Sequence, residues 1–343
     1  MNVRRLIPTA ALSCAALLGL TALTACGADG AGGGRKDGRL DVVASFYPLQ
    51  FLTEQIGGDH VAVTALTKPG VEPHDLELRA RQIVKLNDAD AVVYLKGLQP
   101  AVDKAVEQAD VKTKVDASTL TSMEKHGNEV GGHAAAHDHA AAGDTAAGDT
   151  AGAGEDHGDH GHSHSEAGDD PHIWLDPVKY AEVAKGVGAA LAKADPAHAA
   201  DYRKNTDTLV GRLGALDKEY AAALKDSTTL TSRVFITTHA AFGYLAERYG
   251  LTEEAINGLD PDSEPSPARI KDLQKMAKAD GVTTVFYETL VSDKTAKTLA
   301  SDTSLKTDVL DPLEGITDRS RGTDYFSVMR SNLTALTTAL TAK

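Results

Sequence analysis

One amphipathic stretch, at about residues 196–226, constrains the fold more than any other part of the chain. Its large apolar residues recur at intervals of three, four or seven, which is the spacing of one face of an α-helix. They are Tyr202, Leu209, Leu213, Leu216, Tyr220 and Leu224. Such a helix would be about 40 Å long at 1.5 Å per residue. Because that is too long for a crossover within one sheet, we expect a linker helix between two lobes.

Segments of strand and helix length alternate on both sides of this stretch. Before it, apolar runs at 40–46, 61–66 and 91–95 alternate with helical patterns at 49–56, 80–86, 101–109 and 181–191. After it, runs at 234–238, 283–287 and 307–310 alternate with helical patterns at 240–249, 268–279, 294–300 and 325–340. This alternation predicts an α/β fold with two lobes, at 40–195 and 227–343, each a mostly parallel sheet flanked by helices. We expect ligands to bind in the cleft between the lobes.

The N-terminal residues have the pattern of a bacterial lipoprotein signal. Arg4 and Arg5 precede an apolar segment that ends in Leu23-Thr24-Ala25-Cys26, a sequence that resembles a lipobox. We therefore expect a signal peptide at 1–25, a lipid on Cys26 and a flexible Gly-rich tether at 26–39. An ordinary secretory signal is the alternative. The protein would then be extracytoplasmic, anchored to the outer face of the bacterial cytoplasmic membrane.

Charge and cysteine content narrow the chemistry further. The formal net charge of −14 argues against nucleic-acid binding and suits attraction of cations. Cys14 lies inside the predicted signal, so Cys26 would be the only cysteine of the mature chain. A cysteine metal site is therefore excluded, and any metal must be held by His, Asp and Glu.

Residues 124–170 form a run of Gly, Ala, Asp, Glu and His that contains almost nothing to bury. We predict a disordered loop that collects metal or senses its availability through individually weak sites. A solvated insertion that binds metal only incidentally is the alternative. The histidines of this run are His126, His133, His137, His139, His157, His160, His162 and His164.

Five histidines lie outside this run. We expect His60 and His198 at the surface, one in a turn signal and one near the start of the long helix. His74, His172 and His239 lie in predicted loops or at a strand end. Neutral imidazole together with a carboxylate is a ligand set that suits zinc. Their separations in sequence say nothing about proximity, so only the fold can bring the three rings together.

Four short segments give a specific resemblance. In this order they are similar to segments of the zinc-binding lipoproteins of bacterial ABC importers, the cluster A-I or cluster 9 solute-binding proteins of the ZnuA and AdcA types. The resemblance extends from about residue 40 to the C-terminus, and it implies two α/β lobes, a rigid connecting helix and a metal held between the lobes. The segments are Glu72-Pro73-His74-Asp75, His172-Ile173-Trp174-Leu175-Asp176-Pro177, Thr238-His239-Ala240-Ala241-Phe242 and Asp311-Pro312-Leu313-Glu314.

The resemblance also implies a set of metal ligands. The family's three histidines correspond to His74, His172 and His239, and its acidic ligand corresponds to Glu314. Glu288 follows a predicted strand and competes for that fourth position, and some zinc-type members use the acid beside the first histidine, here Glu72. Manganese-type members carry a carboxylate where this chain has His239, and they lack the His-rich loop. Both differences favour zinc.

The implied function is capture of extracellular Zn²⁺ and its delivery to a membrane permease and ATPase, by a protein expected to be a monomer and not an enzyme. We expect affinity to fall as the pH drops toward the histidine pKa of about 6.5. A manganese-type binding protein and a surface zinc buffer or adhesin without a transporter are alternatives. A secreted zinc hydrolase is a third, but the sequence contains neither His-Glu-x-x-His nor its inverse.

Overall fold

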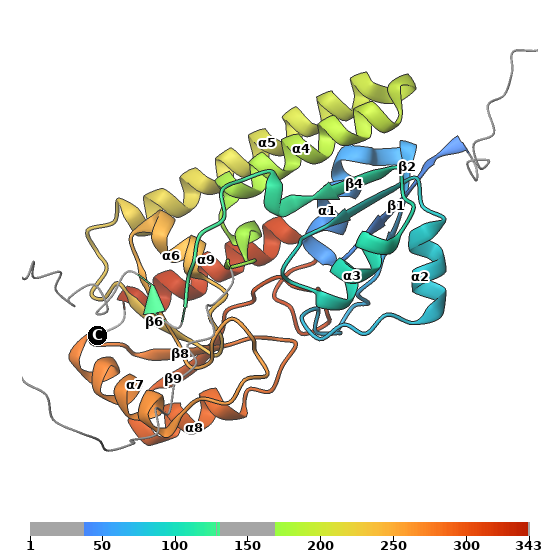
Figure 1. Cartoon of the computed structure of the whole chain (residues 1–343). Helices are drawn as coiled ribbons and strands as arrows, with labels where there is room; N and C mark the ends of the chain where they lie inside the picture. The colour runs from blue at the N-terminus through green and yellow to red at the C-terminus, as the bar shows by residue number, and fades with distance from the viewer. Residues whose placement is uncertain (1–37, 128, 131–168, 342–343) are drawn as a thin grey trace, which may run out of the picture. The chain divides into compact units, whose positions relative to one another are not determined.

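The computed structural model describes residues 38–127, 129–130 and 169–341 (Figure 1). The predicted signal peptide, Cys26 and all but the last two residues of the tether lie outside these residues. So do seven histidines of the His-rich run, which are His133, His137, His139, His157, His160, His162 and His164. Among the described residues, no helix has the length and apolar character needed to cross a bilayer.

The first lobe is built on a four-stranded parallel sheet in the order β2-β1-β3-β4. Its strands are β1 (Leu40–Ala44), β2 (Val61–Ala65), β3 (Ala91–Tyr94) and β4 (Thr113–Asp116), and its helices are α1 (Tyr47–Gly57), α2 (Ala80–Asn87) and α3 (Pro100–Gln108). Successive strand residues point to opposite faces of a sheet. Val42 accordingly packs in the core that contains residues of α1, and Val43 packs in a second core with residues of α2 and α3. The predicted parallel sheet with helices on both faces is confirmed; β4 was not predicted.

The second lobe contains a five-stranded sheet in the order β5-β7-β6-β8-β9, parallel except for β5. Its strands are β5 (Glu129–Val130), β6 (Val234–Thr237), β7 (Thr252–Ala255), β8 (Thr284–Tyr287) and β9 (Lys306–Val309). Its helices are α6 (Gly243–Tyr249), α7 (Pro267–Ala279), α8 (Lys294–Thr303) and α9 (Tyr325–Thr341). Ile236 and Val285 pack with residues of α7 and α8 on one face. Phe235 packs on the other face, in the core that also contains residues of α6 and α9.

Two long helices, α4 (Pro177–Ala194) and α5 (Ala199–Tyr220), run side by side along the molecule (Figure 1). Asp176 caps α4, because its side chain accepts hydrogen bonds from the first-turn amides, and Pro177 occupies the first helical position. The apolar residues that predicted the long helix are all buried in α5 or in the π-turn that follows it. The helix begins a few residues later than predicted, since 196–198 form a separate short 3₁₀ turn. It contacts α1 of the first lobe and α9 of the second.

The boundaries predicted for the disordered run need correction at both ends. Residues 124–127 and 169–170 have defined positions, and Glu129–Val130 pairs with β7 as the antiparallel edge strand of the second sheet. The backbone N–H of Asp170 donates to the carbonyl of Glu124 at 2.8 Å, which closes the base of the segment. The composition of the run hid these contacts, because few apolar residues mark them.

Candidate metal centre

His74 is presented by the loop that follows β2. Its backbone N–H donates to Oε1 of Glu72 at 3.1 Å. The carbonyl of Pro73 accepts a hydrogen bond from Nε2 of Gln99 at 3.1 Å, and Gln99 is the buried residue that precedes α3. The residue just before His74 is therefore tied to the framework of the first lobe, and the side chain of His74 is 12% exposed.

His172 is fully buried and is oriented by Asp170. One carboxylate oxygen of Asp170, Oδ1, accepts hydrogen bonds from the backbone N–H of His172 at 2.9 Å and from its Nδ1 at 2.7 Å. Nε2 therefore faces the opposite way, into the site. Trp174, in the 3₁₀ turn after His172, donates from Nε1 to the carbonyl of Pro312 at 2.7 Å. This bond fixes His172 relative to the segment of the second lobe that carries Glu314.

His239 follows β6 and is oriented in the same way by Glu288, which follows β8. Oε1 of Glu288 accepts from Nδ1 of His239 at 2.7 Å and from Oγ1 of Thr238 at 2.8 Å. Because β6 and β8 are parallel neighbours, their carboxyl ends meet at one edge of the sheet. Glu288 was the alternative candidate for the fourth ligand. In the structure its contacts are instead those of a residue that holds His239 in place.

Glu314 lies in a tight turn after β9. Leu313 adopts a positive φ of 60°, which is uncommon for a side chain branched at Cγ, and it is fully buried. Oδ1 of Asp311 accepts from the backbone N–H of Leu313 at 2.9 Å. Asn332 of α9 in turn accepts from the backbone N–H of Asp311 and donates to its carbonyl, at 3.0 and 2.7 Å. These contacts hold the strained turn that directs the Glu314 carboxylate into the protein.

The three imidazoles converge on one carboxylate oxygen. Oε1 of Glu314 lies 3.0 Å from Nε2 of His74, 3.3 Å from Nε2 of His172 and 3.6 Å from Nε2 of His239. The four residues offer ligand atoms that all lie within 4.8 Å of one another. Nε2 of His239 and Oε2 of Glu314 are buried and have no hydrogen-bond partner among the described residues. Three imidazole nitrogens and one carboxylate fit a tetrahedral zinc ion.

The charges of the metal-free site are set by burial and by these contacts. Burial would lower the pKa of His172, but the Asp170 carboxylate and Glu314 raise it to about 9. Burial likewise opposes a charged His239, yet Glu288 and Glu314 raise its pKa well above the ordinary value. Burial would raise the pKa of Glu314, and the surrounding imidazoles instead hold it well below its usual range. A divalent cation would therefore have to displace protons from His172 and His239 at neutral pH.

Glu72, the other acid considered as a fourth ligand, lies beside this group. Burial and then the charge of Glu314 raise the pKa of Glu72 to about 9, so that it is protonated at neutral pH. Glu72, Glu288 and Glu314 each offer an oxygen within 4.8 Å of the others. Glu72 is not in the group that contains the three histidines, whereas Glu314 is its centre. The geometry favours Glu314 as the acidic ligand.

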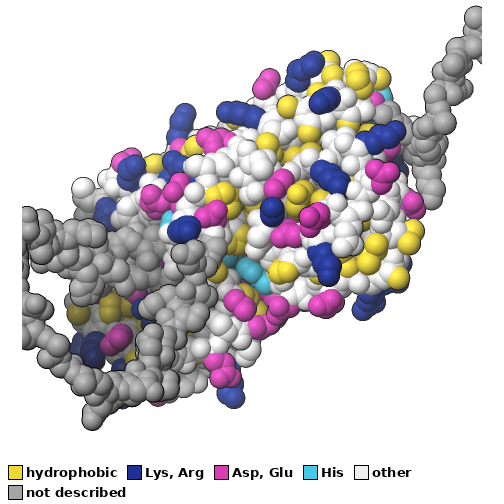
Figure 2. Space-filling view, in the orientation of Figure 1, with side chains coloured by type: hydrophobic (Ala, Val, Ile, Leu, Met, Phe, Trp, Pro, Cys, Tyr) yellow, Lys and Arg dark blue, Asp and Glu magenta, His cyan; other side chains and the backbone are white. Residues whose placement is uncertain are grey.

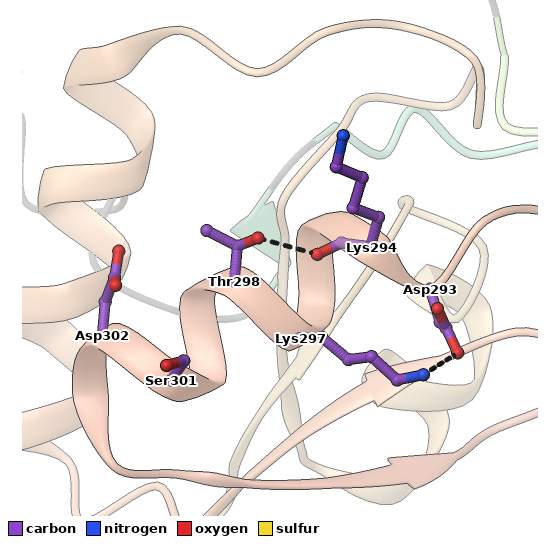
Figure 3. A pocket seen from close by; sticks show the side chains of 6 residues that line it. All are labelled: Asp293, Lys294, Lys297, Thr298, Ser301 and Asp302. Carbon is purple, nitrogen blue, oxygen red and sulfur yellow. Dashed lines mark hydrogen bonds and ion pairs between the residues drawn. The ribbon is translucent and has the colours of Figure 1, made fainter.

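A surface cavity lies between loops of the two lobes, although none of its lining residues belongs to the group of three histidines and Glu314. It has Pro69 and Gly70 of the first lobe on one side and residues between Ile316 and Thr323 of the second lobe on the other. These segments flank Glu72 and Glu314 in sequence. Figure 2 shows histidine in a recess of the surface, with acidic side chains beside it. A different pocket is lined by Asp293, which precedes α8, and by residues of that helix such as Lys297; none of its lining residues belongs to the metal centre (Figure 3).

The remaining histidines of the described chain lie elsewhere. His60 and His198 stack with ring centroids 4.0 Å apart, and their side chains are 31% and 35% exposed, in keeping with the expected surface positions. His126 is 8% exposed and bonds to Asp170. The orienting role of Asp170 was not predicted; the only signal for it is its place two residues before His172, as an acid next to a proline.

Comparison with known proteins identifies the family of the chain. The family model described as zinc-uptake complex component A, periplasmic, matches residues 42–339. The chain is 38% identical over 304 residues to the zinc-binding protein AdcA of Streptococcus pyogenes. The aligned region covers 88% of this chain and 56% of AdcA. The chain thus spans about half the length of the AdcA relatives it matches. It is 37% identical over 314 residues to the high-affinity zinc uptake system protein ZnuA of Bacillus subtilis, covering 90% of both chains.

Solved structures give the same result. The Zn(II)-bound ZnuA-like domain of Streptococcus pneumoniae AdcA superposes with a TM-score of 0.68 at 31% sequence identity, and the match covers 89% of this chain and 100% of that domain. Both the sequence relationship and the two-lobe fold therefore point to one family. This chain belongs to the ZnuA family, whose model describes the periplasmic component A of a zinc-uptake complex.

Proposed function

We propose that this protein captures Zn²⁺ outside the cytoplasm and delivers it to an ABC-type permease and its ATPase. The observation that carries this proposal is the convergence of three imidazole Nε2 atoms on Oε1 of Glu314. A third imidazole at the position of His239 favours zinc over manganese, because harder cations prefer oxygen ligands. The names of the AdcA and ZnuA relatives, which concern zinc binding and zinc uptake, support the same choice.

The ligand set also supports binding rather than catalysis. Four protein ligands would close a tetrahedral zinc shell, and a catalytic zinc needs an open position for water or substrate. Asp170 and Glu288 are each committed to a histidine Nδ1, so neither is placed as a general base. The protein would therefore hold the ion without transforming a substrate.

The origin of the ligands suggests how the ion is released. His74 and His172 belong to the first lobe, whereas His239 and Glu314 belong to the second. Zinc would bind the lobes together, and the permease would release it by separating them.

The segments outside the described residues complete the proposal: a signal peptide at 1–25, a lipid on Cys26, a tether at 26–39, and a His-rich segment that collects zinc weakly. The lobes would be 40–195 and 227–343, joined by the helix at about 196–226, in a monomeric protein.

Zinc stoichiometry of the purified mature protein tests the proposal. The wild-type chain should retain one tightly bound zinc against a competing chelator, and His239→Ala should lose it. His198→Ala is the matched control, because it removes a histidine that lies outside the centre, in the 3₁₀ turn before α5. Retention of one tight zinc by His239→Ala would exclude the proposed site. A surface zinc buffer that works without a transporter would bind zinc equally well. Such a protein, unlike a transport protein, would not bind to membranes that contain the cognate permease.

A further inference from the structure

His126 belongs to the folded protein, although it opens the His-rich run. Its ring stands edge-on to Tyr244, with centroids 4.6 Å apart and an interplanar angle of 81°. It also lies against the backbone of Gly243, where an added Cβ would come within 2.5 Å of Nδ1. Only glycine leaves room for the ring at this place in α6. The position of His126 is therefore defined by packing, and its side chain is 8% exposed.

The hydroxyl of Tyr244 makes hydrogen bonds to both chain segments that meet beside His126, at Glu124 and at Asp170. It accepts a hydrogen bond from the backbone N–H of Glu124 at 2.8 Å and donates to the carbonyl of Asp170 at 2.8 Å. The direct bond from the N–H of Asp170 to the carbonyl of Glu124 adds a third connection. The backbone on both sides of the ring is thus held to the second lobe, and His126 faces Asp170 in a fixed geometry.

The contact between the two side chains continues to the metal centre. Nδ1 of His126 donates to Oδ2 of Asp170 at 2.7 Å, while Oδ1 of the same carboxylate accepts from Nδ1 of His172 at 2.7 Å. Asp170 is completely buried. Each oxygen of the buried Asp170 carboxylate therefore bonds a different imidazole. One of these, His172, presents its Nε2 to Glu314.

We propose that His126 is a positioning residue for the zinc ligand His172, acting through Asp170. The two hydrogen bonds to Oδ1 leave the carboxylate able to tilt about its Cβ–Cγ bond, and the bond to Oδ2 restricts this movement. Loss of the donor would also leave a buried oxygen without a partner, which is costly. Asp170 would then move to regain hydrogen bonds, and the ring of His172 would lose its defined direction.

This inference rests on the proposed function, and the test separates the two. The zinc dissociation constant of the full mature protein is measured by chelator competition for the wild type, His126→Leu and His126→Asn. Outer residues that orient a ligand change metal affinity by about 10- to 100-fold, and the indirect position of His126 places it at the low end, about 10-fold for His126→Leu. Asparagine places its side-chain amide where Nδ1 of histidine lies, so His126→Asn should retain most of the wild-type affinity.

Two further variants keep the test decisive. His126→Gln is polar and of similar length, but its amide falls at the Nε2 position, so it should lose affinity like His126→Leu even if the leucine variant folds poorly. Glu247→Gln changes only the exposed partner of Nε2, which is 3.3 Å away, and should bind zinc like the wild type. Equal affinity of the wild type, His126→Leu and His126→Gln would overturn the inference, as would equal losses in the leucine and asparagine variants. A wild-type protein that binds no zinc would instead overturn the proposed function.

Discussion

Zinc binding should release protons at neutral pH, because the metal-free site holds protons on His172 and His239. The pKa of His172 is about 9, raised against the effect of burial by Asp170 and Glu314, and that of His239 is also raised well above its ordinary value. At pH 7, displacing the proton from His172 alone costs on the order of 3 kcal/mol, because its pKa lies about two units above that pH. Apparent affinity should therefore rise at least about tenfold from pH 7 to pH 8. The rise continues to higher pH than an unperturbed histidine pKa of about 6.5 would give.

Isothermal titration calorimetry in buffers of different ionisation enthalpy measures this release. The slope of the observed enthalpy against buffer enthalpy gives the number of protons displaced, and we expect a value between one and two at pH 7.5. Asp170→Asn supplies a contrast, since it removes the carboxylate that most raises the pKa of His172, and it should lower the number released. A proton count near zero, together with an affinity that is flat between pH 7 and pH 8, would refute this account of the site.

Three other perturbations test separate parts of the structure. Glu288→Ala removes the acceptor for Nδ1 of His239 and should weaken zinc binding about 10- to 100-fold in chelator competition; an unchanged dissociation constant would contradict its orienting role. Deleting residues 131–168, which leaves β5 and Asp170 in place, should remove weak zinc binding and keep one tight site; loss of the tight site in calorimetry would show that the division of roles is wrong. Burial raises the pKa of Glu253 to about 7, so stability should fall as the pH rises from about 4.5 to 7. Urea denaturation at pH 8 should therefore find Glu253→Gln more stable than the wild type, by up to about 3 kcal/mol, and equal stabilities there would argue against a raised pKa.

The elements that the sequence predicted well are those whose apolar residues follow one period. The face of α5 is an example, since every residue that marked it is buried. β7 was missed because Thr252–Ala255 contains Glu253 and Glu254, acids that are buried through specific partners such as Thr237 and Arg269. β5 was missed because it is two residues long and lies in a polar run. Local pattern does not reveal burial that depends on a distant partner.

The metal centre likewise depends on partners that are distant in sequence. Residue type made His74, His172 and His239 candidate metal ligands, and the family resemblance implied all three together with Glu314. No spacing rule, however, places residues from both lobes around one point. The resemblance favoured Glu314 over Glu288 as the acidic ligand, but which histidine atoms each carboxylate contacts is defined only by the fold. His126 shows the opposite case, because composition assigned it to a loop while the contacts with Tyr244 and Asp170 place it in the framework.

The most direct measurement is a crystal structure of the zinc-loaded protein with an anomalous difference map recorded at the zinc absorption edge. The account predicts a peak about 2.0–2.2 Å from Nε2 of His74, His172 and His239 and from a carboxylate oxygen of Glu314, with Glu288 and Asp170 still bonded to the Nδ1 atoms. A strongest peak that lacks either His239 or Glu314 as a ligand would contradict it.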